Sequence, residues 1–410
     1  MSFRAPERPA WVERLIAHGD AVGGAERLVS LSADDLVEAA RASTGLDDFG
    51  AGDWRTHFDV LLRSLEEESD LHLAGRLLAR TEILTALRNR LRLTELWRQR
   101  PQLLESEIQA PVFIVGPPRS GTSILHELMA CDPARRAPAL WEMQHPVEAL
   151  EGADRAELAD RVTRFWHDLQ PEYETMHANS GRAPNECIFI TLHEFLSDHW
   201  SGNHVVPAYE SHLQSTDAHD AYRLHARFLK TLQARGGSRS WLLKAPSHLF
   251  QLRTLFDVYP DARIVRTHRD PLRTLPSAVS LMGTLKWMRC RRVDLSDVPA
   301  RMAFGYAYIY AKEMEQRASG VLPDDRFVDV HFADLVRDPV ATVADVHRRL
   351  GWDFPPEVRR RVAEYAAARP RAARGLHRYS LAGVGLDGGE LRERFRAYME
   401  RYGVAEEEAD

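Results

Sequence analysis

Residues 111–123 read PVFIVGPPRSGTS, an apolar run that leads into a glycine-containing loop. Gly116 and Gly121 are five positions apart, and Thr122 and Ser123 follow, which approaches the spacing of a phosphate-binding loop. Such a loop joins a strand to a helix and surrounds an anion with backbone N–H groups and the positive end of the helix. The usual lysine is missing, because Thr122 occupies its position. The spacing predicts a phosphate site unlike that of nucleotide triphosphatases.

The loop carries one charged side chain, Arg119, which offers a planar fork of donors rather than a point charge. We expect Arg119, Ser120, Gly121, Thr122 and Ser123 to contact the anion. No downstream strand ends in an obvious acidic side chain that could hold Mg²⁺. The pattern therefore favours an anion bound by arginine and backbone, without a metal ion.

A second basic element lies at 266–281, RTHRDPLRTLPSAVSL. Arg269 ends a predicted strand, and Ser277 lies just inside a helix expected to start near Pro276. A strand-end arginine, a hydroxyl and a helix N-terminus can converge on a second phosphate, although Arg269 could instead pair with Asp270. Two separate phosphate sites favour a ligand with two separated phosphate groups, since a triphosphate needs one contiguous site.

Three segments, VGPPRSGTS, LLKAPSH and IVRTHRDPLRTLPSAVSL, resemble in order and spacing the motifs of sulfotransferases that use 3′-phosphoadenosine 5′-phosphosulfate (PAPS). The P-R-S-G-T form is similar to that of tyrosylprotein sulfotransferases and bacterial small-molecule sulfotransferases. The resemblance spans roughly 110–390. It implies that the loop holds the 5′-phosphosulfate and that Arg269 and Ser277 hold the 3′-phosphate. The implied reaction moves a sulfuryl group from PAPS to a hydroxyl of a small or lipidic acceptor and releases adenosine 3′,5′-bisphosphate.

Sulfuryl transfer needs a cation that stabilises developing charge and an acceptor held in line with the sulfur. Lys244 ends the predicted strand 241–246, and it matches the lysine that follows the second strand in tyrosylprotein sulfotransferases. We expect Lys244 to supply the cation and Arg119 to share that role.

The reaction also needs a base for the acceptor's proton. The resemblance favours Glu142, in APALWEMQHP, because related enzymes carry a catalytic glutamate at a similar place. A histidine is the alternative, with His177 in ETMHANSGRAPNE ranked before His145 and His126. The chain has 18 histidines, so each of them singly is more typical of a structural residue.

Two further regions are weaker candidates. The glycine-rich and basic stretch 375–389 resembles the loop that closes over the nucleotide in the family, which makes Arg378 a candidate for the 3′-phosphate. An apolar acceptor pocket could be lined by aromatic residues, although core packing is the more common role for each: Trp141, Phe165, Trp166, Trp200 and Tyr209.

The elements that must position these residues alternate between strand and helix. Apolar strands are predicted at 111–116, 241–246, 262–270 and 326–335. Helices are predicted at 122–130, 248–259, from Pro276, at 298–319 and at 338–351, the last with Asp338 as cap and Gly351 as terminator. This order predicts an α/β fold, a P-loop-type parallel sheet flanked by helices on both faces.

The sequence predicts three regions. Residues 1–105 form a helical extension with a break near Gly75, and residues 106–395 form the α/β domain. Within this domain, 148–235 is a helical insert over the active site. Residues 396–410 are a C-terminal tail, with the acidic end frayed.

Composition limits the function classes. The net charge of −6 argues against a nucleic-acid partner. Three scattered cysteines suggest neither a disulfide framework nor a metal-ligand pair, and no apolar run has transmembrane length. We expect a cytoplasmic enzyme, with peripheral membrane contact and oligomeric state open. The alternatives are a Mg-dependent P-loop kinase and a catalytically diverged sulfotransferase-fold binding protein.

Overall fold

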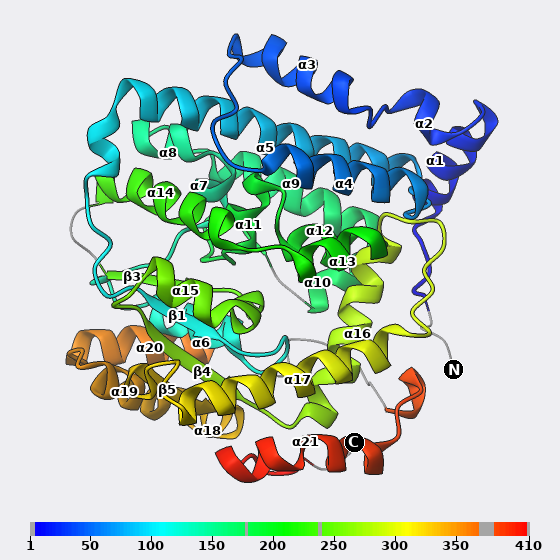
Figure 1. Cartoon of the computed structure of the whole chain (residues 1–410). Coiled ribbons are helices and arrows are strands. Elements are labelled where there is room, and N and C mark those ends of the chain that lie inside the picture. The colour runs from blue at the N-terminus through cyan, green and yellow to red at the C-terminus, as the bar shows by residue number, and fades with distance from the viewer. Residues whose placement is uncertain (1–4, 177–178, 237–239, 369–380, 408–410) are drawn as a thin grey trace.

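The computed structural model describes residues 5–176, 179–236, 240–368 and 381–407. Its centre is a five-stranded parallel sheet in the order β2-β3-β1-β4-β5 (Figure 1). The strands are β1 (Val112–Val115), β2 (Arg135–Arg136), β3 (Ser240–Lys244), β4 (Arg263–His268) and β5 (Phe327–His331).

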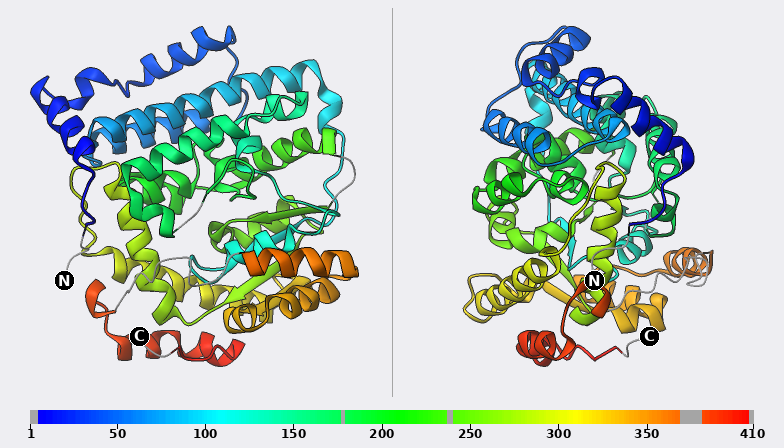
Figure 2. Two further views of the ribbon diagram at one scale, coloured as in Figure 1. Left: turned by 180° about the vertical axis from the view of Figure 1, so that it is seen from behind. Right: turned by 90° about the vertical axis from the view of Figure 1, so that its right-hand side faces the viewer.

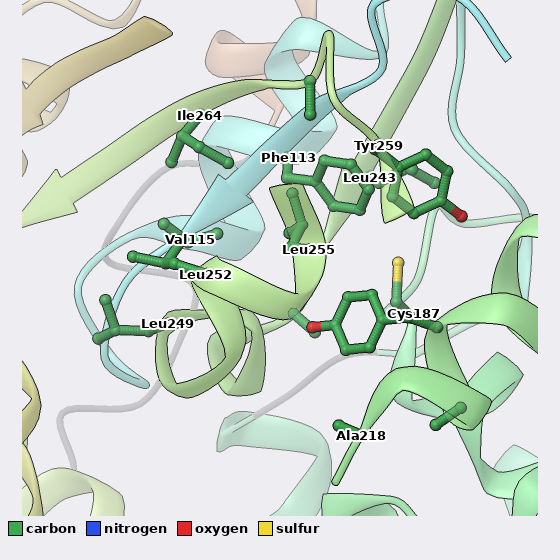
Figure 3. Packing of buried hydrophobic residues seen from close by; sticks show 14 of the residues in the cluster. Phe113, Val115, Cys187, Ala218, Leu243, Leu249, Leu252, Leu255, Tyr259 and Ile264 are labelled. Atoms are coloured by element: carbon green, nitrogen blue, oxygen red, sulfur yellow. The ribbon is translucent and has the colours of Figure 1, made fainter. Parts of the chain in front are cut away.

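Side-chain alternation along the strands builds an apolar core on each face of the sheet. Val112 and Ile114 of β1 face one core, and Phe113 and Val115 face the other (Figure 3). The first core includes α6 (Thr122–Met129), α19 (Pro339–Leu350) and α20 (Pro356–Ala368). The second includes α14 (His219–Gly236), α15 (Leu252–Val258), α17 (Val298–Ala318) and α21 (Gly388–Tyr402). The predicted α/β sheet with helices on both faces is confirmed.

The insert forms a helical layer between the sheet and the N-terminal helices (Figures 1 and 2). It follows α7 (Leu140–Gln144) and contains α8 (Pro146–Glu151), α9 (Ala156–Leu169), α10 (Pro171–Met176), α11 (Ile188–Thr191), η2 (Leu192–Glu194), α12 (Asp198–Asn203), α13 (Pro207–Ser215) and α14. The N-terminal layer contains α1 (Ala10–Ala21), α2 (Ala25–Leu28), α3 (Ala33–Thr44), α4 (Trp54–Glu67), α5 (Leu73–Gln99) and η1 (Pro101–Leu104). Helix α5 contacts α7, α8 and η2, so the two layers share an interface.

The remaining elements lie in the connections between strands and in the C-terminal part of the chain. They are η3 (Pro246–Gln251), α16 (Pro271–Trp287), η4 (Asp324–Arg326), α18 (Phe332–Arg337) and η6 (Ala382–Val384).

Two predicted element boundaries are wrong. Helix α16 begins at Pro271 rather than near Pro276, because the Asp270 side chain accepts the Leu272 N–H at 2.8 Å and caps the helix there. The predicted strand 326–335 ends at His331, where the chain turns into α18.

The break in the N-terminal helices also lies earlier than predicted, between Glu67 and Leu73. Gly75 instead lies in the first turn of α5, where an added Cβ would overlap the Arg289 carbonyl oxygen. This glycine allows close packing of two backbones rather than ending a helix. The predicted boundaries of α19 are confirmed within one residue: Asp338 accepts the Ala341 N–H at 2.9 Å, and Gly351 adopts a left-handed conformation.

Candidate functional site

The predicted phosphate loop lies at the carboxyl edge of the sheet, between β1 and α6. Both loop glycines are required by their surroundings. A Cβ at Gly116 would overlap the Thr267 hydroxyl, and Gly121 has φ +91° with Phe332 only 2.8 Å from where its Cβ would be. Since α6 begins at Thr122, the N–H groups of its first turn face this loop.

Arg119 joins the two predicted anion sites. Its backbone has φ +71°, a left-handed conformation that is uncommon for a residue with a side chain. Its Nε donates to Ser277 Oγ at 3.1 Å, and its Nη1 donates to the Met176 carbonyl at 3.1 Å. Arg269 Nη1 in turn donates to the Arg119 carbonyl at 2.8 Å. The loop, the end of β4 and the second turn of α16 therefore form one connected arrangement.

Two of the predicted loop ligands have side chains turned into the protein. The Ser120 hydroxyl is buried and lies 2.7 Å from both the Pro117 carbonyl and the Thr267 hydroxyl. Thr122 is also buried, at the start of α6. These residues can offer the loop their backbone N–H groups, while the Ser120 hydroxyl holds the loop against β4.

Lys244 lies at the end of β3 and is buried. Its Nζ donates to Ser123 Oγ at 3.0 Å and to Glu186 Oε1 at 2.6 Å. An ammonium group has three donors, so one remains for a ligand. The structure thus brings a cation, a carboxylate and the loop helix together at one point.

Glu186 was not singled out in the sequence, although it ends the quoted stretch ETMHANSGRAPNE. The next residue fixes its position, because the Cys187 N–H donates to the Lys244 carbonyl at 2.8 Å. An isolated bridge between Ala139 and Pro184 places this segment beside the start of α7. The available signal was weak: a glutamate directly after a proline- and glycine-containing stretch that precedes an apolar helix.

Glu142, the predicted base, has other partners. Its Oε2 accepts the Ala139 N–H at 2.9 Å, which caps α7, and its Oε1 accepts from Arg136 at 3.1 Å. These contacts make it a bridge between β2 and α7. They favour Glu186 over Glu142 as the carboxylate beside Lys244.

The histidine alternatives are a buried residue, a half-buried residue and one that lies outside the described residues. His126 is buried, its Nε2 lies 3.2 Å from the Leu242 carbonyl, and burial with the nearby Lys244 charge lowers its pKa to about 3. Burial also lowers the pKa of His145, which directly precedes α8. His177 and Arg378 lie outside the described residues.

Arg269 has an anionic partner, Glu407, from the C-terminal segment that follows α21. Its Nε and Nη2 donate to the two carboxylate oxygens of Glu407, both at 2.8 Å. The Glu407 N–H donates to Asp270 at 3.0 Å, and the Arg269 guanidinium lies 3.9 Å from the centre of the Phe332 ring. The predicted frayed tail is therefore wrong for its described part, and Arg269 pairs with Glu407 rather than with Asp270.

The five predicted acceptor-pocket aromatics do not line one pocket. They belong to different apolar clusters. Trp200 and Tyr209 lie in the core shared with the N-terminal helices, Trp166 and Phe165 pack with α1 and α5, and Trp141 packs against the core beside the sheet. Core packing accounts for them because each fills space between helices.

A matching family model identifies the family of this chain. A model described as "Sulfotransferase family" matches residues 111–356, which is more than half of the chain and includes the loop, Glu186, Lys244 and Arg269. The chain belongs to the sulfotransferase family. The predicted resemblance is thereby confirmed at the level of the family.

Related proteins agree with this membership. The chain is 25% identical over 271 residues to "Omega-hydroxy-beta-dihydromenaquinone-9 sulfotransferase Stf3" of Mycobacterium bovis and of Mycobacterium tuberculosis, covering 62% of this chain and 67% of each relative. The structure of sulfotransferase STF1 from M. tuberculosis matches with a TM-score of 0.76 at 29% identity, covering 89% of this chain and 98% of that chain. Sulfotransferase STF9 from Mycobacterium avium shares the fold, with a TM-score of 0.80 at 24% identity over 91% of this chain and 97% of that chain. Among the described residues of this family member, no helix combines the length and apolarity needed to cross a membrane.

Proposed function

We propose that this sulfotransferase moves a sulfuryl group from PAPS to a hydroxyl of a small or lipidic acceptor. One observation supports the proposal: Arg119 of the loop donates to Ser277 of α16 and accepts from Arg269 through its carbonyl, while Lys244 donates to Ser123 after the same loop. This arrangement suits a ligand with two separated anionic ends.

In this proposal, the loop N–H groups, the Ser123 hydroxyl and Arg119 bind the 5′-phosphosulfate of the donor. Arg269, which follows β4, and Ser277, in the second turn of α16, bind the 3′-phosphate. Arginine suits both positions because its fork of donors matches phosphate oxygens bidentately.

Glu186 would take the proton from the acceptor hydroxyl as the acceptor oxygen bonds to sulfur. The bond between sulfur and the bridging phosphate oxygen breaks, and its electron pair stays with that oxygen. Lys244 and Arg119 stabilise the negative charge that develops there. The Glu186–Lys244 contact of 2.6 Å keeps the base and the cation next to each other before the reaction.

The acceptor class is proposed from the name of a relative. A quarter of aligned positions are identical to a sulfotransferase named for an ω-hydroxylated menaquinone. We infer a hydroxyl on a lipidic or similarly apolar molecule as the acceptor, reached by peripheral rather than transmembrane contact.

Two other functions are a Mg-dependent kinase and a sulfotransferase fold that only binds the nucleotide. In a Mg-dependent kinase, the Ser123 hydroxyl would bind the metal ion, and a loop lysine would reach the outer phosphates. Here that hydroxyl accepts from Lys244, and the lysine position holds Thr122, which favours the sulfotransferase. A protein of this fold that only binds the nucleotide would show no turnover, so a measurement of activity distinguishes it from an enzyme.

The nucleotide specificity gives the first test. We expect adenosine 3′,5′-bisphosphate to bind with one molecule per chain in calorimetry, with equal affinity with or without Mg²⁺. The physical reason is that side chains and backbone donors, rather than a metal ion, neutralise both phosphates. Binding of ATP–Mg²⁺ with no binding of the bisphosphate would contradict the proposal.

The C-terminal contact gives a second test, because Glu407 occupies donors that the 3′-phosphate would use. We expect Glu407→Gln to raise the affinity for adenosine 3′,5′-bisphosphate roughly twofold to fivefold, the size expected for a partly exposed ion pair. Glu406→Gln is the matched control, since Glu406 pairs with Arg392 instead. Equal affinities of the two variants would show that the tail does not compete with the nucleotide.

A further inference from the structure

A cluster of one cysteine and two histidines lies next to the proposed catalytic pair, Glu186 and Lys244. Cys187 precedes α11, His225 lies within α14, and His248 lies in η3. One ligand atom from each residue lies within 4.8 Å of the others, and all three residues are buried. Figure 3 shows the Cys187 sulfur pointing toward Tyr259 among the apolar side chains of the core.

Hydrogen bonding in this cluster is incomplete. The Nδ1 atom of His225 lies 2.7 Å from the Tyr259 hydroxyl, and that of His248 lies 2.6 Å from the Tyr222 hydroxyl. The Nε2 atoms of both histidines are buried without a hydrogen-bond partner. A buried polar atom without a partner is costly, so this pair requires an explanation.

A hydrogen bond from the cysteine cannot satisfy both histidines. The Cys187 thiol has one hydrogen and can donate to only one Nε2 atom. Aromatic and apolar groups surround the cluster: the Phe113 ring lies 5.1 Å from the His248 ring and 6.2 Å from the His225 ring. A metal ion would satisfy the sulfur and both Nε2 atoms together.

We propose that Cys187, His225 and His248 bind a zinc ion. One thiolate and two imidazoles are ligands that Zn²⁺ prefers, and three protein ligands leave a fourth position for water. Tyr222 and Tyr259 hydrogen-bond the opposite ring nitrogens, as partners around zinc-binding histidines do. The three ligand atoms lie within 4.8 Å of one another, so they must move closer together to reach tetrahedral spacing around the ion.

Zinc binding needs neutral imidazoles and a deprotonated thiol. The ion would therefore displace the Cys187 thiol proton when it binds.

The zinc ion would hold three segments of the site together without entering the reaction. Cys187 follows Glu186 and donates its N–H to the Lys244 carbonyl, while His248 lies four residues beyond Lys244. His225 would tie both segments to α14. The ion would therefore help to position the base, Glu186, and the cation, Lys244, through the segments that contain them.

The test uses the full chain without a histidine tag, loaded with Zn²⁺ or Co²⁺ and passed through a desalting column. We expect one zinc per chain by elemental mass spectrometry, and a thiolate-to-cobalt charge-transfer band in the absorption spectrum of the cobalt form. Wild-type protein that retains no metal would overturn the proposal.

Matched variants assign the ligands. Cys187→Ser is expected to remove the charge-transfer band, whereas Cys131→Ser keeps it, because Cys131 lies on the far side of the sheet with its thiol toward the Glu127 carbonyl. Tyr222→Phe changes little in volume and is expected to weaken zinc binding about 10-fold to 100-fold. A cobalt band unchanged by Cys187→Ser would place the metal elsewhere and overturn the proposal.

Discussion

Replacing Glu186 with glutamine is expected to lower kcat for sulfuryl transfer by about 100-fold to 10,000-fold, the contribution typical of a positioned general base. Glutamine keeps the size of the side chain and can still accept a hydrogen bond from Lys244, which lies 2.6 Å from Glu186. It cannot take a proton from the acceptor. Affinity for adenosine 3′,5′-bisphosphate should therefore change little, and single-turnover kinetics with calorimetry on the same variant measures both quantities.

Glu142→Gln is the matched control for this variant. Its carboxylate caps α7 and pairs with Arg136. Glu142→Gln is therefore expected to lower the thermal unfolding temperature, while kcat per folded molecule stays near that of the wild type. If Glu142→Gln abolishes turnover and Glu186→Gln remains near normal, the assignment of the base is reversed. The pH profile of kcat separates the two further, since only loss of the base removes its acid limb.

Arg269→Gln is expected to weaken binding of adenosine 3′,5′-bisphosphate by about 30-fold to 3,000-fold, which corresponds to losing the arginine of the charge pair that Arg269 would form with the bound 3′-phosphate. The variant loses the donor fork that now holds Glu407 and also the donor to the Arg119 carbonyl. Removal of this second contact should loosen the loop, so PAPS turnover falls as well. Calorimetry and initial rates with PAPS measure the two effects.

Arg269→Lys tests whether the geometry or the charge matters. Lysine keeps one positive charge but cannot form a bidentate contact, so we expect an affinity between those of the wild type and Arg269→Gln. Affinity for adenosine 5′-phosphosulfate, which lacks the 3′-phosphate, should respond much less to either substitution. Equal losses for both nucleotides would show that Arg269 acts on the loop rather than on the 3′-phosphate.

Local signals in the sequence were sufficient to predict the fold. Continuous apolar runs such as PVFIV predicted buried parallel strands, and the Asp338 and Gly351 signals gave the ends of α19. The errors arose where competing local signals were present. Asp270 with Pro271 formed a stronger helix start than Pro276, and the apolar run after β5 became α18 because an apolar run alone does not distinguish strand from helix.

The site was predictable only in part. The loop, Lys244 and Arg269 could be selected as candidates because they directly follow strands or lie in recognisable motifs, and their roles stay predictions. Glu186 and Glu407 were not, since their partners are 58 and 138 residues away and tertiary packing alone brings them together. The glutamate chosen by resemblance, Glu142, lies in the neighbouring segment and caps a helix.

The proposed sulfuryl transfer is tested most directly by mass spectrometry of a lipid extract incubated with PAPS and the protein. The account predicts a product one sulfo group heavier than a hydroxylated acceptor, formed by the wild type and strongly reduced with Glu186→Gln. It also predicts that isotopic label in the sulfo group of PAPS appears in that product. If labelled PAPS binds but no labelled product forms across lipid, phenol and sugar extracts, the proposed activity is contradicted.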